Sequence, residues 1–508
     1  MDSQTVARDS RLLKMPLEVL FQISDHLTTR DYGILRLVCK HMEASLVGNF
    51  AREFFTKRQF MLTEFSLQGL VDISKSKFSR CLSHVIISPE RPSLSRVPGR
   101  FMVAPSSLTA SDSQAVEQNC FRSECADHLS LISTGQDVVM LAEAFGNLPS
   151  LETVEIRDFN SRSRNREGPD GEWTSFGARK FMRETGARAS LEWPGRHFGS
   201  LTPDHLVYLS HVFSALLRSL GASSSRPKRL EVNLRHCGLA DHAFNIPRYS
   251  ESVIEPVLSS LRTLFLEPNS QLPAAYVDGD NALVPCYSFL LRKFLAKGQQ
   301  LEHFRINFRG YNQDDAKDFL LWLSKTPALS TSSNRPAVSL LESPQPVEFP
   351  KLEKLDIGMV KVEPQMLLAV LRKFQKTLRA VSFHRLSLLQ TDPTLAQTKV
   401  DLWSKFFDQL FRLRLNLTDM QISNVSQQGP LHVSPTVSVL FNDQHPTRAV
   451  RKWAGKDFAG ACKDFKESLD ITWPPEDNQQ SSGNDGTDVD SGDAGSDEDS
   501  DDDSDDGN

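Results

Sequence analysis

Cysteine is scarce in this chain, and its cysteines lack the spacing of any known framework. The 508 residues include seven cysteines, an odd number, and no Cys-x-x-Cys pair occurs among them. No pair of histidines at metal-ligand spacing accompanies them. Neither a disulfide framework nor a zinc site is indicated. The composition predicts a reducing, intracellular environment, in the cytoplasm and/or the nucleus.

Long apolar runs are absent as well. No stretch reaches 18 consecutive apolar residues, the length that a membrane-crossing helix requires. The first residues, MDSQTVARDSRLLK, contain no apolar segment of a secretory signal. We therefore expect no membrane partner.

The common catalytic and phosphate-binding motifs do not occur. We find no GxGxxG, GxxxxGK[ST], HExxH or GxSxG sequence. His236 and Cys237 are neighbours, but adjacent residues of a strand point to opposite faces and do not form a base and nucleophile pair. We predict a protein without catalytic residues, cofactor or metal ion.

Positive charge is missing from the C-terminal segment. Residues 476–508 contain fourteen Asp and Glu and no Lys or Arg, and their removal changes the net charge from −6 to +8. A charge of this size, scattered over 475 residues, does not indicate a specific nucleic-acid partner. The acidic segment has low complexity and few apolar side chains, so we expect a disordered tail there.

Apolar residues gather near the N-terminus in helical patterns. Pro16 suits a first helical turn, because its missing N–H needs no partner there. Leu17, Leu20, Ile23 and Leu27 follow at spacings of three and four, which predicts one apolar stripe along a first helix.

Two further helices are expected directly after the first. Thr28 and Asp31 have the spacing of a capping box, with the acid in the positive first turn of the second helix. A third helix carries apolar residues four apart, at Met42, Leu46, Phe50 and Phe54. A unit of residues 11–55 buries too small a fraction of its surface to be comfortably stable alone, so we expect it to pack against a neighbour.

A second pattern, an amphipathic helix followed by Leu-x-x-apolar-x-apolar, returns through residues 56–475. It predicts strands at 83–88, 151–156, 230–234, 261–266, 301–306, 352–357, 378–383, 417–422 and 437–442. It predicts helices at 138–145, 205–220, 252–261, 287–298, 365–378, 402–413 and 445–471. Composition places disordered insertions near 88–125, 160–173 and 324–346. Three arginines of the second insertion, at positions 162, 164 and 166, are expected to be solvated.

The alternation resembles a leucine-rich-repeat solenoid, in which each repeat adds one strand to a shared parallel sheet. The spacing of the strands is irregular, and an ordinary α/β domain of unrelated βα units is the alternative. Either way we predict an α/β fold: a three-helix unit, an irregular leucine-rich-repeat-like solenoid, and a disordered acidic tail.

Positions that flank the last apolar residue of each strand lie on the concave face of such a solenoid, and they are candidate substrate-binding residues. The set includes three arginines, one histidine and three acids, which does not distinguish acidic, basic and phosphorylated ligands. Its members are Glu155, Arg157, Asn233, Arg235, Phe265, Glu267, Arg305, Asn307, Asp356, Ser382, His384 and Gln421.

The N-terminal segment resembles an F-box. The residues that carry the resemblance are Met15-Pro16-Leu17-Glu18, Ile23, Leu27, Asp31, Leu35 and Arg36-Leu37-Val38-Cys39-Lys40. They follow the family pattern Leu-Pro-x-Glu-x-Leu, then Ile, Leu, Asp-Leu and Leu-Arg-x-Val-Cys-Lys. Met15 and Tyr32 replace the usual leucines, and Met42 stands where a tryptophan is common. Residues 66–88 also resemble the segment that follows the F-box in many fungal members.

The resemblance implies a substrate receptor of an SCF-type ubiquitin ligase. The F-box at 11–55, after a flexible 1–10, would dock on a Skp-type adaptor and through it on a cullin. The region at 56–475 would capture an unknown protein substrate. The family implies that the adaptor contacts lie at Met15, Pro16, Leu17, Val19, Leu20, Ile23, Leu27, Leu35, Val38 and Cys39. The alternatives are a scaffold that binds the adaptor without cullin, and a free repeat module whose N-terminal helices cap the array.

Overall fold

A computed structural model describes most of the first 473 residues of the chain. The described residues are 11–93, 112–162, 166, 172–189, 203–270, 274–277, 283–286, 288–309, 312–327, 344–391, 399–429, 436–442 and 448–473. The chain divides into two compact units, Met1–Thr472 and Trp473–Asn508, and all that follows concerns the first. Several predictions lie outside the described residues: the flexible N-terminus at 1–10, the acidic tail at 476–508 and most of the insertion at 324–346. The same holds for Arg164 and for the side chain of Arg162.

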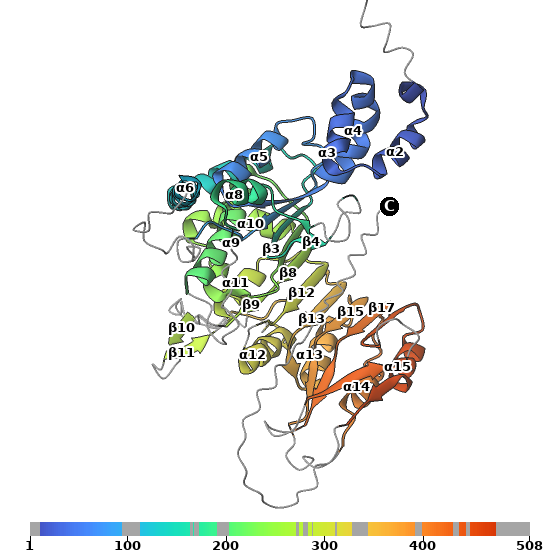
Figure 1. Ribbon diagram of the computed structural model, residues 1–508. Coiled ribbons are helices and arrows are strands. Elements are labelled where there is room, and N and C mark those ends of the chain that lie inside the picture. Colours follow the sequence, from blue (N-terminus) through green and yellow to red (C-terminus); the bar gives the residue numbers. More distant parts are fainter. Residues whose placement is uncertain are drawn as a thin grey trace, which may run out of the picture. The chain divides into compact units, whose positions relative to one another are not determined.

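The N-terminal unit consists of a short 3-10 helix and three α-helices (Figure 1). They are η1 (Arg11–Lys14), α2 (Leu17–Asp25), α3 (Thr29–Leu37) and α4 (Lys40–Phe55). Apolar side chains from all three α-helices meet in a small core made of Leu20, Tyr32, Met42, Leu46 and Phe54. The three helices predicted from the apolar spacing are therefore present.

A ten-stranded sheet follows, and its strands lie side by side in the order in which they occur along the chain. They are β1 (Lys57–Met61), β2 (His84–Ser88), β3 (Thr153–Arg157), β6 (Arg229–Asn233), β8 (Thr263–Leu266), β12 (His303–Asn307), β13 (Lys354–Gly358), β15 (Ala380–His384), β17 (Asp419–Ser423) and β20 (Val450–Ala454). Every pairing is parallel except the last, between β17 and β20.

Helices cover one face of this sheet (Figure 1). The larger ones are α5 (Glu64–Ser74), α7 (Gln136–Gly146), α9 (Pro203–Ser223), α10 (Arg248–Ser260), α11 (Phe289–Leu295), α12 (Gln313–Ser324), α13 (Pro364–Phe374) and α14 (Leu402–Arg412). One apolar core lies between helices and strands and continues from Phe60 to Phe465. Side chains alternate along each strand, so the opposite face of the sheet presents the polar positions.

The fold class is confirmed: N-terminal helices precede an α/β region with a large parallel sheet. Eight of the expected strands, from 83–88 to 417–422, coincide with β2, β3, β6, β8, β12, β13, β15 and β17. Strands added in chain order are what a solenoid requires, and the assignment to leucine-rich repeats stays a prediction.

A smaller five-stranded sheet lies at the C-terminal end of the array. Its strands are β14 (Lys361–Val362), β16 (Ser387–Leu389), β18 (Ser426–Gln428), β19 (Thr436–Phe441) and β21 (Leu469–Ile471). The expected strand at 437–442 is thus present, but it joins this second sheet.

The helix predicted over 445–471 is wrong in its first part. Residues 450–454 form strand β20, and only Phe458–Glu467 is helical, as α15. Strand β17 would otherwise be an edge with unpaired backbone groups, and the antiparallel β20 supplies their partners. Cys462 and Phe465 of α15 are buried and cover the end of the apolar core.

The disordered insertion predicted near 88–125 is wrong in its last part, and residues 94–111 of it lie outside the described residues. Helix α6 spans Asp112–Thr134, and its Phe121 and Cys125 pack with Phe181 of α8 (Ala178–Thr185). Two helices that lie far apart in sequence bury these side chains together, which the local composition did not indicate. In the second insertion, the short strands β4 (Ser161–Arg162) and β5 (Glu172–Trp173) pair with each other.

Candidate adaptor-docking and substrate-binding surfaces

The capping pair at the start of α3 forms as predicted. The Asp31 N–H donates to Thr28 Oγ1 at 3.1 Å, and the Thr28 hydroxyl donates to Asp31 Oδ2 at 2.8 Å. This cap ends the link between α2 and α3 at a defined residue.

Several apolar side chains of these helices remain exposed to solvent. On and before α2 they are Met15, Leu17 and Val19, with exposed fractions of 38%, 42% and 37%. At the C-terminal end of α3, Leu37 and Val38 are exposed by 65% and 68%. Leu37 and Val38, which keep about two-thirds of their surface exposed, add little apolar burial to the helical unit.

The ten predicted adaptor contacts fall into three groups. Met15, Pro16, Leu17, Val19 and Val38 are exposed, and Ile23, Leu27, Leu35 and Cys39 are half-buried. Leu20 is buried in the three-helix core, and its packing role there is complete without a partner.

Two exposed apolar residues of α3, Ile34 (53%) and Leu37, were not among the predicted contacts. The sequence held a signal for one of them. Leu37 and Val38 are consecutive and apolar. Neighbouring positions of a helix do not face the same side, so the two side chains could not both face the core.

The N-terminal helices are attached to the array through aromatic and charged contacts. Phe55 of α4 stacks on Phe78, with ring centroids 4.2 Å apart. The Arg36 guanidinium lies over Phe78, 5.9 Å from the ring centroid, and Lys77 pairs with Glu43 at 2.5 Å. These contacts connect Arg36, Glu43 and Phe55 of the helical unit to the segment between α5 and β2.

Arg166 makes a second attachment, and the expectation that it is solvated is wrong. Its side chain is only 5% exposed. Its guanidinium donates to the Ser24 and Leu27 carbonyls and to the Glu53 carboxylate, with Nη2 to Glu53 Oε2 at 2.7 Å. It also lies over the Tyr32 ring, 4.5 Å from the centroid. Burial alone would lower the pKa of Arg166, but the hydrogen bond and charge of Glu53 outweigh it and raise the pKa.

This contact also explains one departure from the F-box pattern. The Tyr32 side chain is fully buried in the core. Its hydroxyl accepts from Asn49 Nδ2 at 3.3 Å, while the face of its ring meets Arg166. A leucine at this position would offer neither the ring face nor the hydroxyl.

Residues 12–46 match the model of the F-box domain. The chain carries an F-box domain. Its bounds cover η1, α2, α3 and the first part of α4. A search of curated proteins found no match to this chain. An F-box domain implies a Skp-type adaptor as a binding partner, and such domains belong to proteins that are generally non-catalytic adaptors of substrate.

The described residues contain neither a membrane-spanning helix nor a candidate metal centre. No helix among them is both long and apolar enough to cross a membrane. Nor does that part of the chain contain a group of three His, Cys, Asp or Glu side chains placed to hold a metal ion. Burial raises the pKa of the Cys237 thiol, which keeps it protonated and unreactive.

On the polar face of the sheet, the predicted substrate-binding residues divide by burial. Arg235, Phe265, Arg305 and His384 are half-buried, as are Asn233, Asp356, Ser382 and Gln421. By contrast, Glu155, Arg157, Glu267 and Asn307 are between 2% and 6% exposed. We assign these four to the interior, because they are buried and hydrogen-bond to one another or to neighbouring strands.

Glu155 is the centre of the first internal network. Its carboxylate contacts His84 Nε2 at 2.7 Å on β2 and accepts from Asn233 Nδ2 at 3.0 Å on β6. Arg157 in turn donates to Gln59 Oε1 at 3.2 Å on β1. Burial by itself would raise the pKa of Glu155, but the His84 hydrogen bond and the Arg157 charge lower it to about 2.

Glu267 is the centre of a second network, at the end of β8. It accepts from the Leu234 N–H at 2.9 Å and from Asn307 Nδ2 at 3.0 Å. Burial raises the pKa of Glu267 to about 7, and the nearby carboxylate of Asp158 adds to the rise.

Asp158 was not predicted as a functional residue, since it lies one position beyond β3. Its carboxylate accepts from the N–H groups of Arg235 and His236, at 2.8 and 3.2 Å, and lies 3.1 Å from His236 Nδ1. Burial raises the pKa of Asp158 to about 6 despite these hydrogen bonds. Together, Asp158 and Glu267 tie the ends of β3, β6, β8 and β12 to one another.

Proposed function

We propose that the chain is the substrate-recognition subunit of an SCF-type ubiquitin ligase. The F-box domain would dock on a Skp-type adaptor, which joins it to a cullin. The polar face of the sheet would recruit a protein substrate. The receptor supplies no nucleophile, and it acts by raising the concentration of substrate lysines near a charged conjugating enzyme. This role places the protein in the cytoplasm, the nucleus or both.

The observation that carries the proposal is the exposure of apolar side chains within the F-box domain. Leu37 and Val38 are about two-thirds exposed, while the core beneath them is complete without them. Helices that merely capped the array would be expected to bury such residues against it. A protein partner that covers them would remove their apolar surface from water.

The attachment of the F-box domain to the array supports the same role. Contacts at Phe78 and at Arg166 hold the helices from two separate segments of the array. A receptor must hold its substrate at a defined distance from the adaptor, and two attachments restrict rotation more than one linker does.

The test is co-purification of the adaptor with variants of the exposed apolar positions. Leu17→Asp and Val38→Asp should each abolish recovery of a Skp-type adaptor, because a carboxylate would be buried without a partner. Val139→Asp is the matched control, since Val139 is 57% exposed on α7, outside the F-box domain. Undiminished adaptor recovery by both F-box variants, with unchanged circular dichroism, would overturn the proposed docking surface.

A second measurement separates a ligase receptor from a scaffold that works without cullin. The cullin subunit should co-purify with the wild-type chain and be lost with Val38→Asp. Recovery of the adaptor without any cullin would favour the scaffold.

A further inference from the structure

A pocket opens at the C-terminal end of the array, where α14 ends and α15 begins. Its volume is about 530 Å³, and the residues that line it come from two segments, 411–415 and 456–459. Pockets of this volume commonly enclose a ligand. The two helices lie side by side (Figure 1), and the rings of Phe407 and Phe465 join them with centroids 5.5 Å apart. The pocket is therefore built on two helices that pack firmly against each other.

The pocket has an apolar floor and an exposed aromatic side chain. Leu415 and Phe458 line it and belong to the continuous apolar core, with 5% and 8% of their surface exposed. Phe411, in the last turn of α14, is 51% exposed. An apolar side chain placed against Phe411 would remove its ring from water.

Three cationic side chains surround this apolar surface. Arg412 and Arg414 come from the end of α14, and Lys456 comes from the link that precedes α15. All three residues are exposed. None of the three side chains forms an ion pair or a hydrogen bond with another described residue. Because the two segments line the pocket together, positive charge reaches it from both.

Asp457 is the acid among the lining residues, and it is part of a helix cap. Its Oδ1 accepts from the Gly460 N–H at 2.9 Å, at the start of α15. Asp419 is exposed at the start of β17, opposite Ala454 of β20. It alternates with the buried Met420, so it lies on the polar face of the sheet, away from the helices. The lining therefore carries three positive charges and one negative charge.

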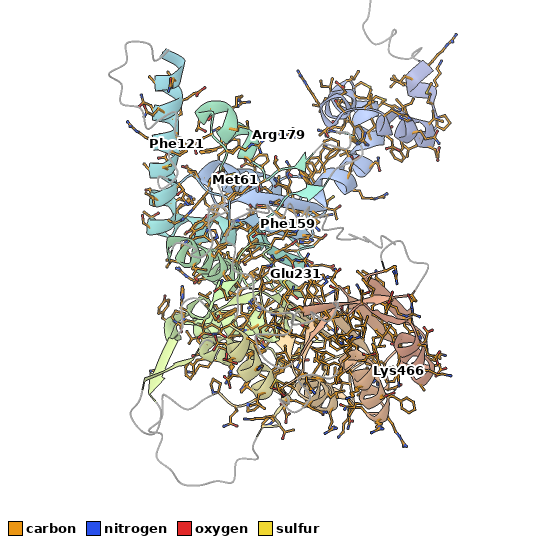
Figure 2. The ribbon with its side chains drawn as sticks, turned by 60° about the horizontal axis from the view of Figure 1, so that its bottom comes forward. Met61, Phe121, Phe159, Arg179, Glu231 and Lys466 are labelled. Carbon is orange, nitrogen blue, oxygen red and sulfur yellow. The ribbon has the colours of Figure 1, made fainter. Side chains whose placement is uncertain are left out.

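The acids within α14 and α15 are paired with other cations. Each of them lies within ion-pair distance of a lysine or arginine that does not line the pocket. The pairs are Asp408 with Lys466 at 2.8 Å (Lys466 is labelled in Figure 2), Asp464 with Arg451 at 2.5 Å, and Glu467 with Lys463 at 3.6 Å. These acids therefore do not neutralise the cations of the pocket.

We propose that this pocket binds an acidic segment of a partner protein, in which Asp and Glu flank one bulky apolar side chain. The apolar side chain lies against Phe411, and the carboxylates meet Arg414 and Lys456. Charge complementarity selects this chemistry, because exposed cations without partners attract carboxylates and repel basic segments. The inference goes beyond the proposed function, since the pocket lies outside both the F-box domain and the polar face of the sheet.

The experiment measures the binding of fluorescent peptides to the purified full chain by anisotropy. The first probe carries one Leu between two runs of Asp and Glu. Ser replaces the Leu in the second probe, and Asn and Gln replace the acids in the third. The first probe should bind, and the others should bind about tenfold more weakly, because each lacks one of the two contacts. Equal affinity for the three probes would overturn the inference.

Variants of the lining residues test the location of the site. Phe411→Ala should weaken binding of the first probe about tenfold, and the double variant Arg414→Gln, Lys456→Gln should weaken it to a similar extent. The matched controls are Leu321→Ala and Arg183→Gln, because these side chains are 44% and 76% exposed on α12 and α8. Both controls should bind as the wild type does. Wild-type affinity in both pocket variants, with unchanged circular dichroism, would contradict the proposed site.

Two further outcomes would assign the pocket to another occupant and thereby overturn the inference. A synthetic peptide of residues 476–508 has fourteen acids, but its largest apolar side chain is that of Val489. It should bind more weakly than the first probe, and tighter binding would identify the chain's own acidic segment as the occupant. A dimer of the chain that Phe411→Ala converts to monomers would identify a second copy. None of these measurements requires the adaptor, so their result is independent of the proposed function.

Discussion

Arg166 lies over the ring of Tyr32, with its guanidinium carbon 4.5 Å from the ring centroid, although the first three strands of the sheet lie between the two residues in the sequence. The same guanidinium donates to Glu53 at 2.7 Å. One side chain of the array therefore contacts α3, α4 and the carbonyls at the end of α2. The orientation of the F-box domain depends on a residue outside it.

Arg166→Ala should loosen this attachment. Removing one partner of a largely buried ion pair leaves Glu53 without its cation, and the cost is on the order of 2 kcal/mol for a pair of this exposure. Hydrogen exchange of the α2–α4 amides should become faster, while exchange in β6–β12 stays the same. Arg166→Lys keeps the charge but loses the planar fork, so an intermediate effect is expected. Unchanged exchange in both variants would contradict the role of Arg166.

Leu20 and Val38 should respond to truncation in opposite ways. Leu20 is 2% exposed, so Leu20→Ala should lower the free energy of unfolding of the F-box domain by about 2–5 kcal/mol. Val38 is 68% exposed, so Val38→Ala should change stability by about 0.5 kcal/mol or less. Adaptor affinity measured by calorimetry should fall for Val38→Ala. A large loss of stability in that variant would show that Val38 is part of a core.

His128 should make stability depend on pH. Burial, together with the charge of Arg91, lowers the pKa of His128 to about 4, and its Nδ1 lies 3.0 Å from the Leu62 carbonyl oxygen. Since the pKa in the unfolded chain is about 6.5, the unfolded state binds more protons between these values. The stability that neutral His128 contributes is present above about pH 6.5 and is lost as the pH falls toward 4.

His128→Gln removes this titration. The difference in unfolding free energy between wild type and variant should decrease by about 2 kcal/mol from pH 7 to pH 5. Urea unfolding at several pH values measures it, and the comparison cancels groups that titrate in the same way in both proteins, such as Asp158 and Glu267. A difference that stays constant over this range would mean that His128 is not neutral by burial.

Gly358 should not tolerate a side chain. A Cβ atom there would lie 2.3 Å from Asn307 Oδ1 and 3.0 Å from the His384 carbonyl oxygen. Gly358→Ala would displace the Asn307 amide, which donates to Glu267, and should cost about 1–3 kcal/mol by overpacking. In the control Gly33→Ala, no atom lies within 4 Å of the new methyl group, and alanine should stabilise α3 by up to about 1 kcal/mol. Thermal unfolding of the two variants should therefore shift in opposite directions.

The amino-acid sequence by itself determined the local elements and the F-box domain. Residues 151–156 and 352–357 were recognised as strands because alternate positions must face the core, and that requirement is written into consecutive residues. The cap formed by Thr28 and Asp31 involves residues three apart, so its geometry is local.

Tertiary structure decided which polar residues are available to a ligand. Arg166 bonds to residues 113 and 142 positions away, and Glu155 bonds to Asn233, 78 positions away. No local pattern encodes such pairs, because each depends on which strands and loops the fold brings together. The same holds for β20, whose strand conformation is set by the unpaired edge of β17. The sequence alone therefore placed Glu155, Glu267 and Arg305 together on the surface of the sheet. In the structure the two glutamates are buried, whereas Arg305 is half-buried.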